Sequence, residues 1–278
     1  MQITTRPFQD ADLGRCLEIE RAAVRSNHYL NDVIDYYRTT KGEFTLALAD
    51  NFPAGMGKLT VLYDGSAWLE LLRVHPDFQR QGMGKAIYRR YLEQVTAFGC
   101  PSARMYTGVK NVASAALAEQ FGLHRGPEFR GMSLPVQDDS FQPQPKPLHL
   151  LGGEAAAENL LPLQEKTGGF LSINHTFYQL NRPTCFGFAA AGWVYGDGEG
   201  SVLVCGARFQ PQKALYIAAL AAPEAKKENA LSFARSLAAM TGAEKLTVHF
   251  PNQDHQEQEF YQAHGFTVDP SDDVVYEW

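Results

Sequence analysis

An internal repeat constrains the fold of this 278-residue chain more than any other feature of its sequence. The apolar segments Ala67–Pro76 and Ala214–Pro223 both have the composition of a buried strand, and both end at a proline. Each is followed by an amphipathic helix that ends at a glycine, Gly99 in the first case and Gly242 in the second. A further strand and helix follow in both, with a last glycine at the same distance. The chain is therefore predicted to contain two copies of one unit, the second lacking a few residues directly after its strand.

A proline-rich segment separates the two copies. Residues 135–147 read PVQDDSFQPQPKP and contain few large apolar side chains. Because proline lacks the backbone donor and disfavours helix and sheet, this segment is predicted to be a stiff, extended linker. The 45% hydrophobic composition gives each half enough apolar residues for a core. We therefore predict domains at residues 1–134 and 148–278.

Strands and helices follow one another in the first half of the chain. Helical spacing of apolar residues predicts helices at Asp10–Val24, Asn31–Arg38, Gly84–Phe98 and Asn111–Gln120. Strands are predicted at Ile3–Phe8, Phe44–Ala49, Met56–Tyr63, Ala67–Val74 and Ser102–Thr107. The order is one strand, two helices, a run of strands, and then helix, strand, helix and strand.

Composition and charge exclude several classes of protein. The 25 basic and 31 acidic side chains give a net charge of −6 with no basic block, so neither nucleic acid nor an anionic membrane is an expected partner. No apolar run approaches the ~20 residues of a transmembrane helix, and Met1–Asp10 lacks an apolar signal region, so a cytoplasmic location is expected. The four cysteines are far apart and no CxxC, HxH or HExxH spacing occurs, so we expect reduced thiols and no structural metal.

The stretch between the first repeated strand and its helix has the composition of an anion-binding loop. Residues 74–86 read VHPDFQRQGMGKA. Gly82 and Gly84 have no side chains, so a ligand can approach the backbone closely. The first N–H groups of the following helix lack intrahelical partners and lie at the positive end of its dipole. Together with the charges of Arg80 and Lys85, these amides are predicted to bind a di-anion such as a pyrophosphate.

One of three phosphate-binding motifs fits this loop. A Walker A loop would need a glycine at Gln79 and a hydroxyl residue at Ala86, and the Rossmann fingerprint would need a third glycine at Ile87. The pattern Q/R-x-x-G-x-G/A fits at Gln79, Gly82 and Gly84. The pattern is short, and its place between a strand ending in proline and an amphipathic helix is what makes it specific.

With these residues the sequence resembles the GNAT (GCN5-related N-acetyltransferase) superfamily. The stretch LLRVHPDFQRQGMGKAIYRRYLEQV is similar to that family's acyl-CoA-binding motif, and NVASAALAEQFGL (Asn111–Leu123) is similar to its later helix. The resemblance covers residues 3–134 and extends to residues 148–278 through the repeat. It implies an α/β (α+β) fold of two tandem GNAT-like domains, each with a mixed, mostly antiparallel, splayed sheet flanked by helices, as in mycothiol synthase-like proteins.

The resemblance implies acetyl-CoA (coenzyme A) as the cofactor, bound to the first domain. The backbone of Leu72 and Val74, with Arg73 between them, would pair with the pantetheine arm in the manner of an added strand. Asn111 matches the family residue near pantetheine, and it is equally well interpreted as an ordinary N-cap. The loop that would hold the pyrophosphate consists of Gln79, Arg80, Gln81, Gly82, Met83, Gly84 and Lys85.

Acetylation of an amine needs a base, since a protonated amine has no lone pair with which to attack a thioester. Glu70 stands where many family members carry a carboxylate, and strand alternation predicts that it shares one face with Leu72 and Val74. We expect either this catalytic role or a sheet carboxylate that is satisfied by Arg73, Arg104 or a hydroxyl group.

Many family members carry their general acid, a tyrosine, on the later helix, and the first copy has Ala118 at that position. Tyr106 on the preceding strand is predicted as the substitute. The second copy has Tyr261 at the equivalent position but lacks the glycine loop, and Ile217 replaces the carboxylate. The second copy is therefore predicted to be degenerate, with Tyr261 packed structurally; an active site around Tyr261 is the weaker alternative.

Three tyrosines and two aspartates between the first two helices occupy the region that often lines the acceptor pocket in the family: Tyr29, Asp32, Asp35, Tyr36 and Tyr37. Aromatic rings and carboxylates suit an ammonium group. A half-buried helix with a solvated acidic face is the favoured explanation of the same residues.

These features predict an acetyl-CoA-dependent N-acetyltransferase that moves an acetyl group to the amine of a small molecule or peptide by direct attack. Its active site would lie in residues 1–134. The missing tyrosine at Ala118 supports a second hypothesis, a non-catalytic acyl-CoA-binding or regulatory protein. The sequence leaves the acceptor open, and it is compatible with a homodimer.

Overall fold

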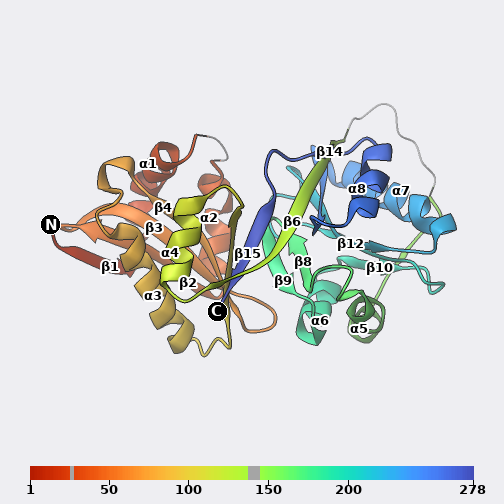
Figure 1. Ribbon diagram of the computed structural model, residues 1–278, viewed down its shortest axis with the longest axis horizontal. Coiled ribbons are helices and arrows are strands. Elements are labelled where there is room, and N and C mark those ends of the chain that lie inside the picture. The colour runs from red at the N-terminus through yellow and green to blue at the C-terminus, as the bar shows by residue number, and fades with distance from the viewer. Residues whose placement is uncertain (26–27, 137–144) are drawn as a thin grey trace. The chain divides into compact units, whose positions relative to one another are not determined.

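The computed structural model describes residues 1–25, 28–136 and 145–278, and the chain divides into two compact units (Figure 1). Unit 1 comprises residues 1–107, 111–126 and 276–278. Unit 2 comprises residues 108–110 and 127–275. Most of the linker predicted at residues 135–147 lies outside the described residues.

Unit 1 is built on a sheet with the strand order β1-β2-β3-β4-β5. The strands are β1 Ile3–Pro7, β2 Gly42–Ala49, β3 Phe52–Val61, β4 Ala67–Val74 and β5 Ala103–Gly108. Neighbouring strands are antiparallel except β4 and β5, which run parallel. The strand after the crossover helix therefore lies beside the strand before it, as a right-twisted βαβ unit requires.

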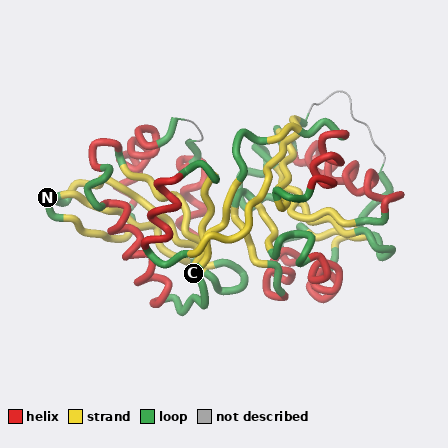
Figure 2. Tube along the Cα trace, in the orientation of Figure 1, coloured by secondary structure: helices red, strands yellow, loops and turns green. Residues whose placement is uncertain are grey.

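Helices pack against this sheet (Figure 2). They are α1 Leu13–Ala23, α2 Leu30–Thr39, α3 Met83–Ala97 and α4 Val112–Gln120. The apolar faces expected from helical spacing are buried, with Cys16 and Ile19 in α1 and Ile87 and Tyr91 in α3. The burial of these faces anchors α1 and α3 to the sheet.

The packing of α3 on the sheet is tightest at Gly57 of β3. A Cβ atom at Gly57 would overlap the hydroxyl of Tyr91 and would lie 2.7 Å from Ile87 Cγ2. The same Tyr91 hydroxyl donates a hydrogen bond to the carbonyl oxygen of Glu70 at 2.9 Å. Gly57 thus lets one buried side chain of α3 reach the backbone of β4.

The last residues of the chain complete unit 1 beside β5. The N–H of Trp278 donates to the carbonyl of Ala103 at 2.9 Å. The guanidinium of Arg104, whose residue is 3% exposed, pairs with Glu277 and, at 3.2 Å, with Asp64. The sequence analysis assigned residues 148–278 to the second domain, whereas residues 276–278 lie in unit 1.

Unit 2 is built on a sheet with the strand order β6-β13-β12-β11-β10-β7, with β14 also beside β6. Residues 127–134 of β6, assigned to the first domain from the sequence, pair with β13 in this unit. β8 and β9 form a separate hairpin. The strands are β6 His124–Pro135, β7 His149–Leu150, β8 Phe170–Ile173, β9 Thr176–Gln179, β10 Val194–Gly196, β11 Val202–Gly206, β12 Leu215–Ala221, β13 Lys245–Pro251, β14 Thr267–Val268 and β15 Asp273–Glu277.

The helices of unit 2 are α5 Gly153–Leu160, α6 Arg182–Ala190, α7 Glu224–Thr241 and α8 His255–Ala263. α7 buries Leu231 and Ala234 in the apolar core of the unit, together with Ile217 of β12 and Tyr261 of α8. Across the described ranges of both units, no helix combines the length and apolarity that crossing a membrane requires.

The two units share the predicted repeat. The order β4, α3, β5 and α4 in unit 1 corresponds to β12, α7, β13 and α8 in unit 2, and the strand pairs β4/β5 and β12/β13 are both parallel. Residues 75–82 separate β4 from α3, whereas residues 222–223 alone separate β12 from α7. The shortening lies where the sequence comparison placed it, and the predicted α/β fold class with mostly antiparallel sheets is confirmed.

Replacing Gly57 with alanine is expected to lower the free energy of unfolding by about 1–3 kcal/mol, because the added methyl group overpacks the contact with Tyr91. Gly14, in the first turn of α1, has no atom within 4 Å of its would-be Cβ. Gly14→Ala is therefore the matched control, with a gain of up to about 1 kcal/mol from helix propensity. Urea unfolding followed by circular dichroism compares the two variants. Equal stability of the two would contradict the described packing of α3.

Candidate active site

The loop between β4 and α3 exposes backbone donors at the start of a helix. β4 ends at Val74, residues 76–78 form one turn of 3-10 helix, and Gly82 is the N-cap of α3 with φ +98°. The first intrahelical hydrogen bond runs from Ala86 N–H to the carbonyl of Gly82 at 3.0 Å. The amides of the first turn, from Met83 to Lys85, therefore have no intrahelical acceptor and remain available to an anion.

Two glutamines of this loop brace it from within. The side-chain Nε2 of Gln79 donates to the carbonyl oxygen of Val74 at 3.1 Å, and the side-chain Nε2 of Gln81 donates to the carbonyl oxygen of Asp77 at 2.8 Å. Arg80 has φ +60°, in the left-handed region that bulky residues rarely adopt. These bonds hold the loop in the shape that presents its amides.

The remaining predicted loop residues lie around the helix start. Arg80 and Lys85 are exposed, and Met83 is buried in the core. A Cβ at Gly84 would lie 3.0 Å from Leu117 of α4, so glycine permits the close approach of α3 and α4. The loop thus combines open amides, two exposed cations and no bulky side chain at either glycine.

β4 and β5 separate soon after they pair. Their parallel pairing covers Ala67 with Ala103 and Trp68 with Arg104, and it ends there. Further along β4, Leu72 and Val74 are half-buried. The backbone N–H and C=O groups on the β5 side of this part of β4 have no partner in β5, so they can pair with an extended ligand.

A β-bulge interrupts β4 at Leu71. Leu71 has φ +58°, and the register with β3 shifts so that Glu70 pairs with Lys58 while Arg73 pairs with Met56. Lys58 and Met56 are two residues apart on β3 and share one face of the sheet. Glu70 and Arg73 therefore share that face. The simple alternation expected from Glu70 through Leu72 and Val74 does not hold, because the bulge inserts one residue.

Two hydroxyl groups hold the Glu70 carboxylate. Thr60 Oγ1 donates to Glu70 Oε1 at 2.6 Å, and the Tyr37 hydroxyl donates to Oε2 at 3.2 Å. Of the alternatives left open by the sequence, hydroxyl groups thus satisfy this carboxylate, while Arg104 is engaged by Asp64 and Glu277. No sequence motif indicates Thr60, because the contact of Thr60 with Glu70 depends on the β3–β4 register.

Aromatic rings and one guanidinium surround this carboxylate. Tyr29 and Tyr37 are hydrogen-bonded to each other, and burial raises the pKa of the Tyr29 phenol. The charge of Arg73 lowers the Tyr29 pKa and the charge of Glu70 raises it, so both side chains lie close to Tyr29. The Nε atom of Arg73 is buried and has no hydrogen-bond partner among the described residues. In contrast, Asp35 forms an exposed ion pair with Arg38 at 2.6 Å and belongs to the solvated face of α2.

The other predicted site residues of unit 1 have clear local roles. Tyr106 stacks on Trp68 with ring centroids 6.2 Å apart, on the face of the sheet that carries Glu70. Asn111 is the N-cap of α4 and accepts a hydrogen bond from Ser114 N–H at 3.2 Å. Ala118 is fully buried, so no hydroxyl group stands at the position of the family's tyrosine.

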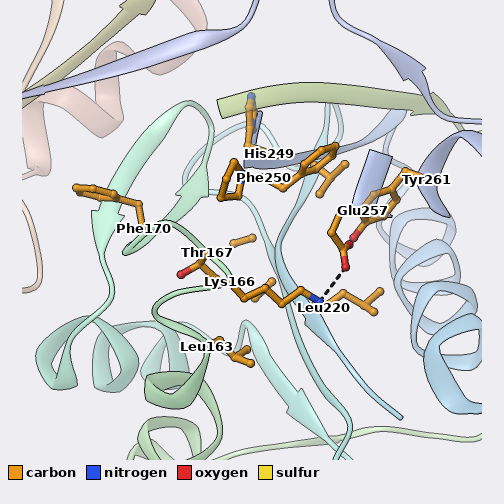
Figure 3. A pocket seen from close by; sticks show the side chains of 13 residues that line it. Leu163, Lys166, Thr167, Phe170, Leu220, His249, Phe250, Glu257 and Tyr261 are labelled. Carbon is orange, nitrogen blue, oxygen red and sulfur yellow. Dashed lines mark ion pairs between the residues drawn. The ribbon is translucent and has the colours of Figure 1, made fainter. Parts of the chain in front are cut away.

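Unit 2 has a pocket where β12 and β13 separate (Figure 3). Its empty volume is about 410 Å³ including the open mouth. Tyr261 and Phe250 line it, and Figure 3 shows Lys166 and Glu257 pointing toward one another. Tyr261 is 1% exposed and packs among Phe250, Phe260 and Phe266, and burial raises its pKa well above the usual value for a phenol.

The start of α7 differs from the start of α3 in its charge. α7 begins at Glu224 directly after Pro223, so a carboxylate occupies the first turn of this helix. A carboxylate there interacts favourably with the helix dipole and repels an anionic ligand. No counterpart of the loop 75–82 is present between β12 and α7.

Comparison with known proteins identifies the first half of the chain. Residues 10–123 match the model of the acetyltransferase (GNAT) family. A comparison with curated proteins gave no match.

Solved structures show that the GNAT fold extends over the whole chain in tandem. A tandem GNAT protein from the clavulanic acid biosynthesis pathway is 17% identical with a TM-score of 0.60, covering 100% of this chain and 98% of its own. A GCN5-related N-acetyltransferase from Sphaerobacter thermophilus is 13% identical with a TM-score of 0.64, covering 99% and 95%. A candidate acetyltransferase from Thermoplasma acidophilum is 14% identical with a TM-score of 0.63, covering 99% of both chains.

Glu257 is expected to stabilise unit 2 through its ion pairs. Its side chain is 8% exposed and lies 2.8 Å from Lys166 Nζ and 3.0 Å from Lys227 Nζ. Glu257→Gln leaves two cations without their counter-charge and is expected to lower the free energy of unfolding by about 2–3 kcal/mol.

The control for this prediction is Glu244→Gln, which breaks the exposed Lys213–Glu244 pair and should change stability by less than about 1 kcal/mol. Chemical denaturation of both variants measures the difference. An equal loss of stability in Glu257→Gln and Glu244→Gln would contradict the prediction, because it would mean that solvent screens the Glu257 ion pairs as it does a surface pair.

Proposed function

We propose that this protein is an acetyl-CoA-dependent N-acetyltransferase whose active site lies in the GNAT domain of unit 1. The observation that carries the proposal is the order in which three features follow one another along β4. β4 presents the Glu70 carboxylate held by two hydroxyl groups, bulges at Leu71, leaves β5, and ends in the amide-lined loop. A base, an open strand edge and an anion site thus follow one another in the order that an acyl-CoA thioester requires.

The residues present fit acetyl-CoA by their chemistry. The amides from Gly82 to Lys85 and the charges of Arg80 and Lys85 suit a pyrophosphate. The backbone of Leu72 and Val74 suits an extended arm with amide groups. When bound, acetyl-CoA supplies the acyl thioester that the amine attacks. Asn111, which caps α4, is proposed to lie beside the same arm.

Glu70 is proposed as the general base. Its Oε1 atom accepts a hydrogen bond from Thr60 and its Oε2 atom accepts one from Tyr37, so the carboxylate is oriented for taking a proton from the acceptor ammonium. Removal of that proton, directly or through one water, frees the nitrogen lone pair for attack. Arg73 lies on the same face of the sheet as this carboxylate.

The acceptor is proposed to be a primary amine of a small molecule or peptide. Tyr29 and Tyr37 place aromatic rings beside a carboxylate, which is a favourable environment for an ammonium group. After Glu70 has released the first proton to water, it would take the second nitrogen proton once the amine has attacked the thioester. Tyr106 is proposed to donate a proton to the departing thiolate, since Ala118 cannot.

A non-catalytic acyl-CoA-binding protein is the second candidate, favoured by one observation. Ala118 is fully buried in α4, where the family's general acid would stand. A thiolate leaves without strong assistance, so this substitution weakens catalysis by at most the ~10²–10⁴-fold that a general acid typically contributes. Binding without turnover would distinguish this candidate from the enzyme.

Calorimetric titration with acetyl-CoA is expected to give one site per chain. The variant Gly82→Trp should abolish this binding, because a large side chain would occupy the loop and meet Ile3. The double variant Arg80→Glu with Lys85→Glu should weaken it without altering the backbone, since both side chains are exposed. Gly14→Trp, at an open position on α1, is the control. Two sites per chain would contradict a degenerate unit 2, and no binding would reject both candidates.

Glu70→Gln is expected to lower kcat by about 10²–10⁴-fold while the KM for acetyl-CoA stays unchanged, because glutamine keeps the shape but is not a base. The assay is release of coenzyme A over a panel of primary amines that includes small amines, amino acids, antibiotics and lysine peptides. Glu93→Gln removes an exposed carboxylate of α3 and should have no effect. Tyr106→Phe in the same assay tests the proposed acid. Unchanged turnover in Glu70→Gln would reject Glu70 as the base.

A further inference from the structure

Unit 2 brings together three side chains of the types that ligate metals, none of which belongs to the candidate acyl-transfer site: His175, His249 and Asp273. His175 lies in the turn between β8 and β9, His249 lies on β13, and Asp273 begins β15. One ligand atom of each lies within 4.8 Å of the other two. Because His175 and Asp273 are 98 positions apart, no short motif in the sequence indicates this cluster.

The distances suit a common metal ion. Asp273 Oδ2 lies 2.9 Å from His175 Nδ1 and 3.8 Å from His249 Nε2. Two ligand atoms of a tetrahedral zinc site, each about 2.0–2.1 Å from the ion, lie about 3.4 Å apart. These two separations fall on either side of that value, and the ligand atoms of His175 and His249 lie within 4.8 Å of each other.

His249 provides a second, independent observation. Its residue is 6% exposed, and its Nε2 atom has no hydrogen-bond partner among the described residues. Its other ring nitrogen, Nδ1, lies 3.3 Å from Ser172 Oγ, which orients the ring. Gly131 of β6 stands opposite His249, and a Cβ there would lie 3.3 Å from Nε2. A buried imidazole nitrogen thus faces Asp273, and the missing side chain at Gly131 makes room for this ring and for the Asp269 carboxylate.

The turn that carries His175 is fixed to the rest of unit 2. Asn174 and His175 both have positive φ, +49° and +52°, as in the tight turn of a hairpin. The Asn174 side chain accepts from Arg208 N–H at 2.8 Å and donates to the carbonyl of Phe209 at 3.2 Å. The His175 ring is therefore held at one edge of the cluster, where its side chain is 36% exposed and reachable from solvent.

We propose that His175, His249 and Asp273 bind one divalent transition-metal ion, with Zn²⁺ as the first choice. Two imidazole nitrogens and one carboxylate oxygen suit zinc, iron, nickel or copper, whereas Mg²⁺ and Ca²⁺ prefer sets of oxygen ligands. Three protein ligands leave a fourth position for water or a small ligand. The ion joins the β8–β9 turn to β13 and β15, so it stabilises unit 2 whether or not unit 1 catalyses acetyl transfer.

The test uses untagged full-length protein stripped with a chelator and titrated with Zn²⁺ by calorimetry and with Co²⁺ by visible absorption. We expect one ion per chain and d–d bands of a tetrahedral Co²⁺ site. Ser172→Ala should reduce affinity by about 10–100-fold, as loss of an outer hydrogen bond to a ligand does, and His175→Asn and Asp273→Asn should reduce it by more. His149→Asn, which removes an exposed histidine of β7, should leave binding unchanged.

Circular dichroism checks that each variant is folded. Because His175 is partly exposed, His175→Asn tests the site without a substitution at the buried His249. The proposal is overturned if the protein binds no ion at stoichiometric concentration, or if His175→Asn and Asp273→Asn bind Zn²⁺ as the parent does. Equal affinity for Mg²⁺ would also overturn it. In those cases the cluster is a hydrogen-bonded His–Asp pair with a packed imidazole.

Discussion

The left-handed backbone at Leu71 is the constraint on which the candidate active site of unit 1 depends. A non-glycine residue in this region carries about 1–2 kcal/mol of strain. Leu71 is 3% exposed, and burial of a leucine side chain contributes about 1.5–3 kcal/mol, enough to offset that strain. The Tyr91 hydroxyl holds the carbonyl of Glu70 beside the bulge, and Gly57 leaves room for it. One glycine, one tyrosine and one leucine thus fix an irregular strand.

The bulge determines which side chains meet. In a regular strand Glu70 would share its face with Leu72, and the site would contain a carboxylate among apolar groups. The inserted residue instead brings Arg73 to the face of Glu70, beside Tyr29. The bulge lies just beyond the point where the parallel pairing with β5 ends. A bulge commonly re-aims side chains next to functional sites, and here it places Glu70 and Arg73 on one face of the sheet.

The features that could be predicted from the sequence are those with local causes. β4 was predicted at its observed bounds, Ala67–Val74, because apolar residues fill it and a proline follows. The helix expected at Gly84–Phe98 begins one residue earlier, where Gly82 caps it. The open amides of the loop between β4 and α3 could be predicted because glycines and a helix start are neighbours in the chain.

The remaining features depend on pairing between distant segments. Thr60 reaches Glu70 only through the register of β3 with β4, and a bulge has no distinctive residue when leucine occupies it. The membership of residues 276–278 in unit 1 depends on hydrogen bonds to Ala103 and on the Arg104 ion pairs. No periodicity within a window of sequence carries such information.

The two units show how one fold separates packing from ligand binding. Both keep a parallel strand pair that opens, with a helix before and after the second strand. Unit 1 leaves the first amides of α3 open at the end of a braced loop, whereas unit 2 begins α7 with Glu224, whose carboxylate complements the same helix dipole. In unit 2 the space between the strands is lined by Tyr261 and by the Lys166–Glu257 ion pair. A helix start can satisfy its positive end with its own carboxylate or with a ligand's phosphate, but not with both, so this single position accounts for the different chemistry expected of two similar units.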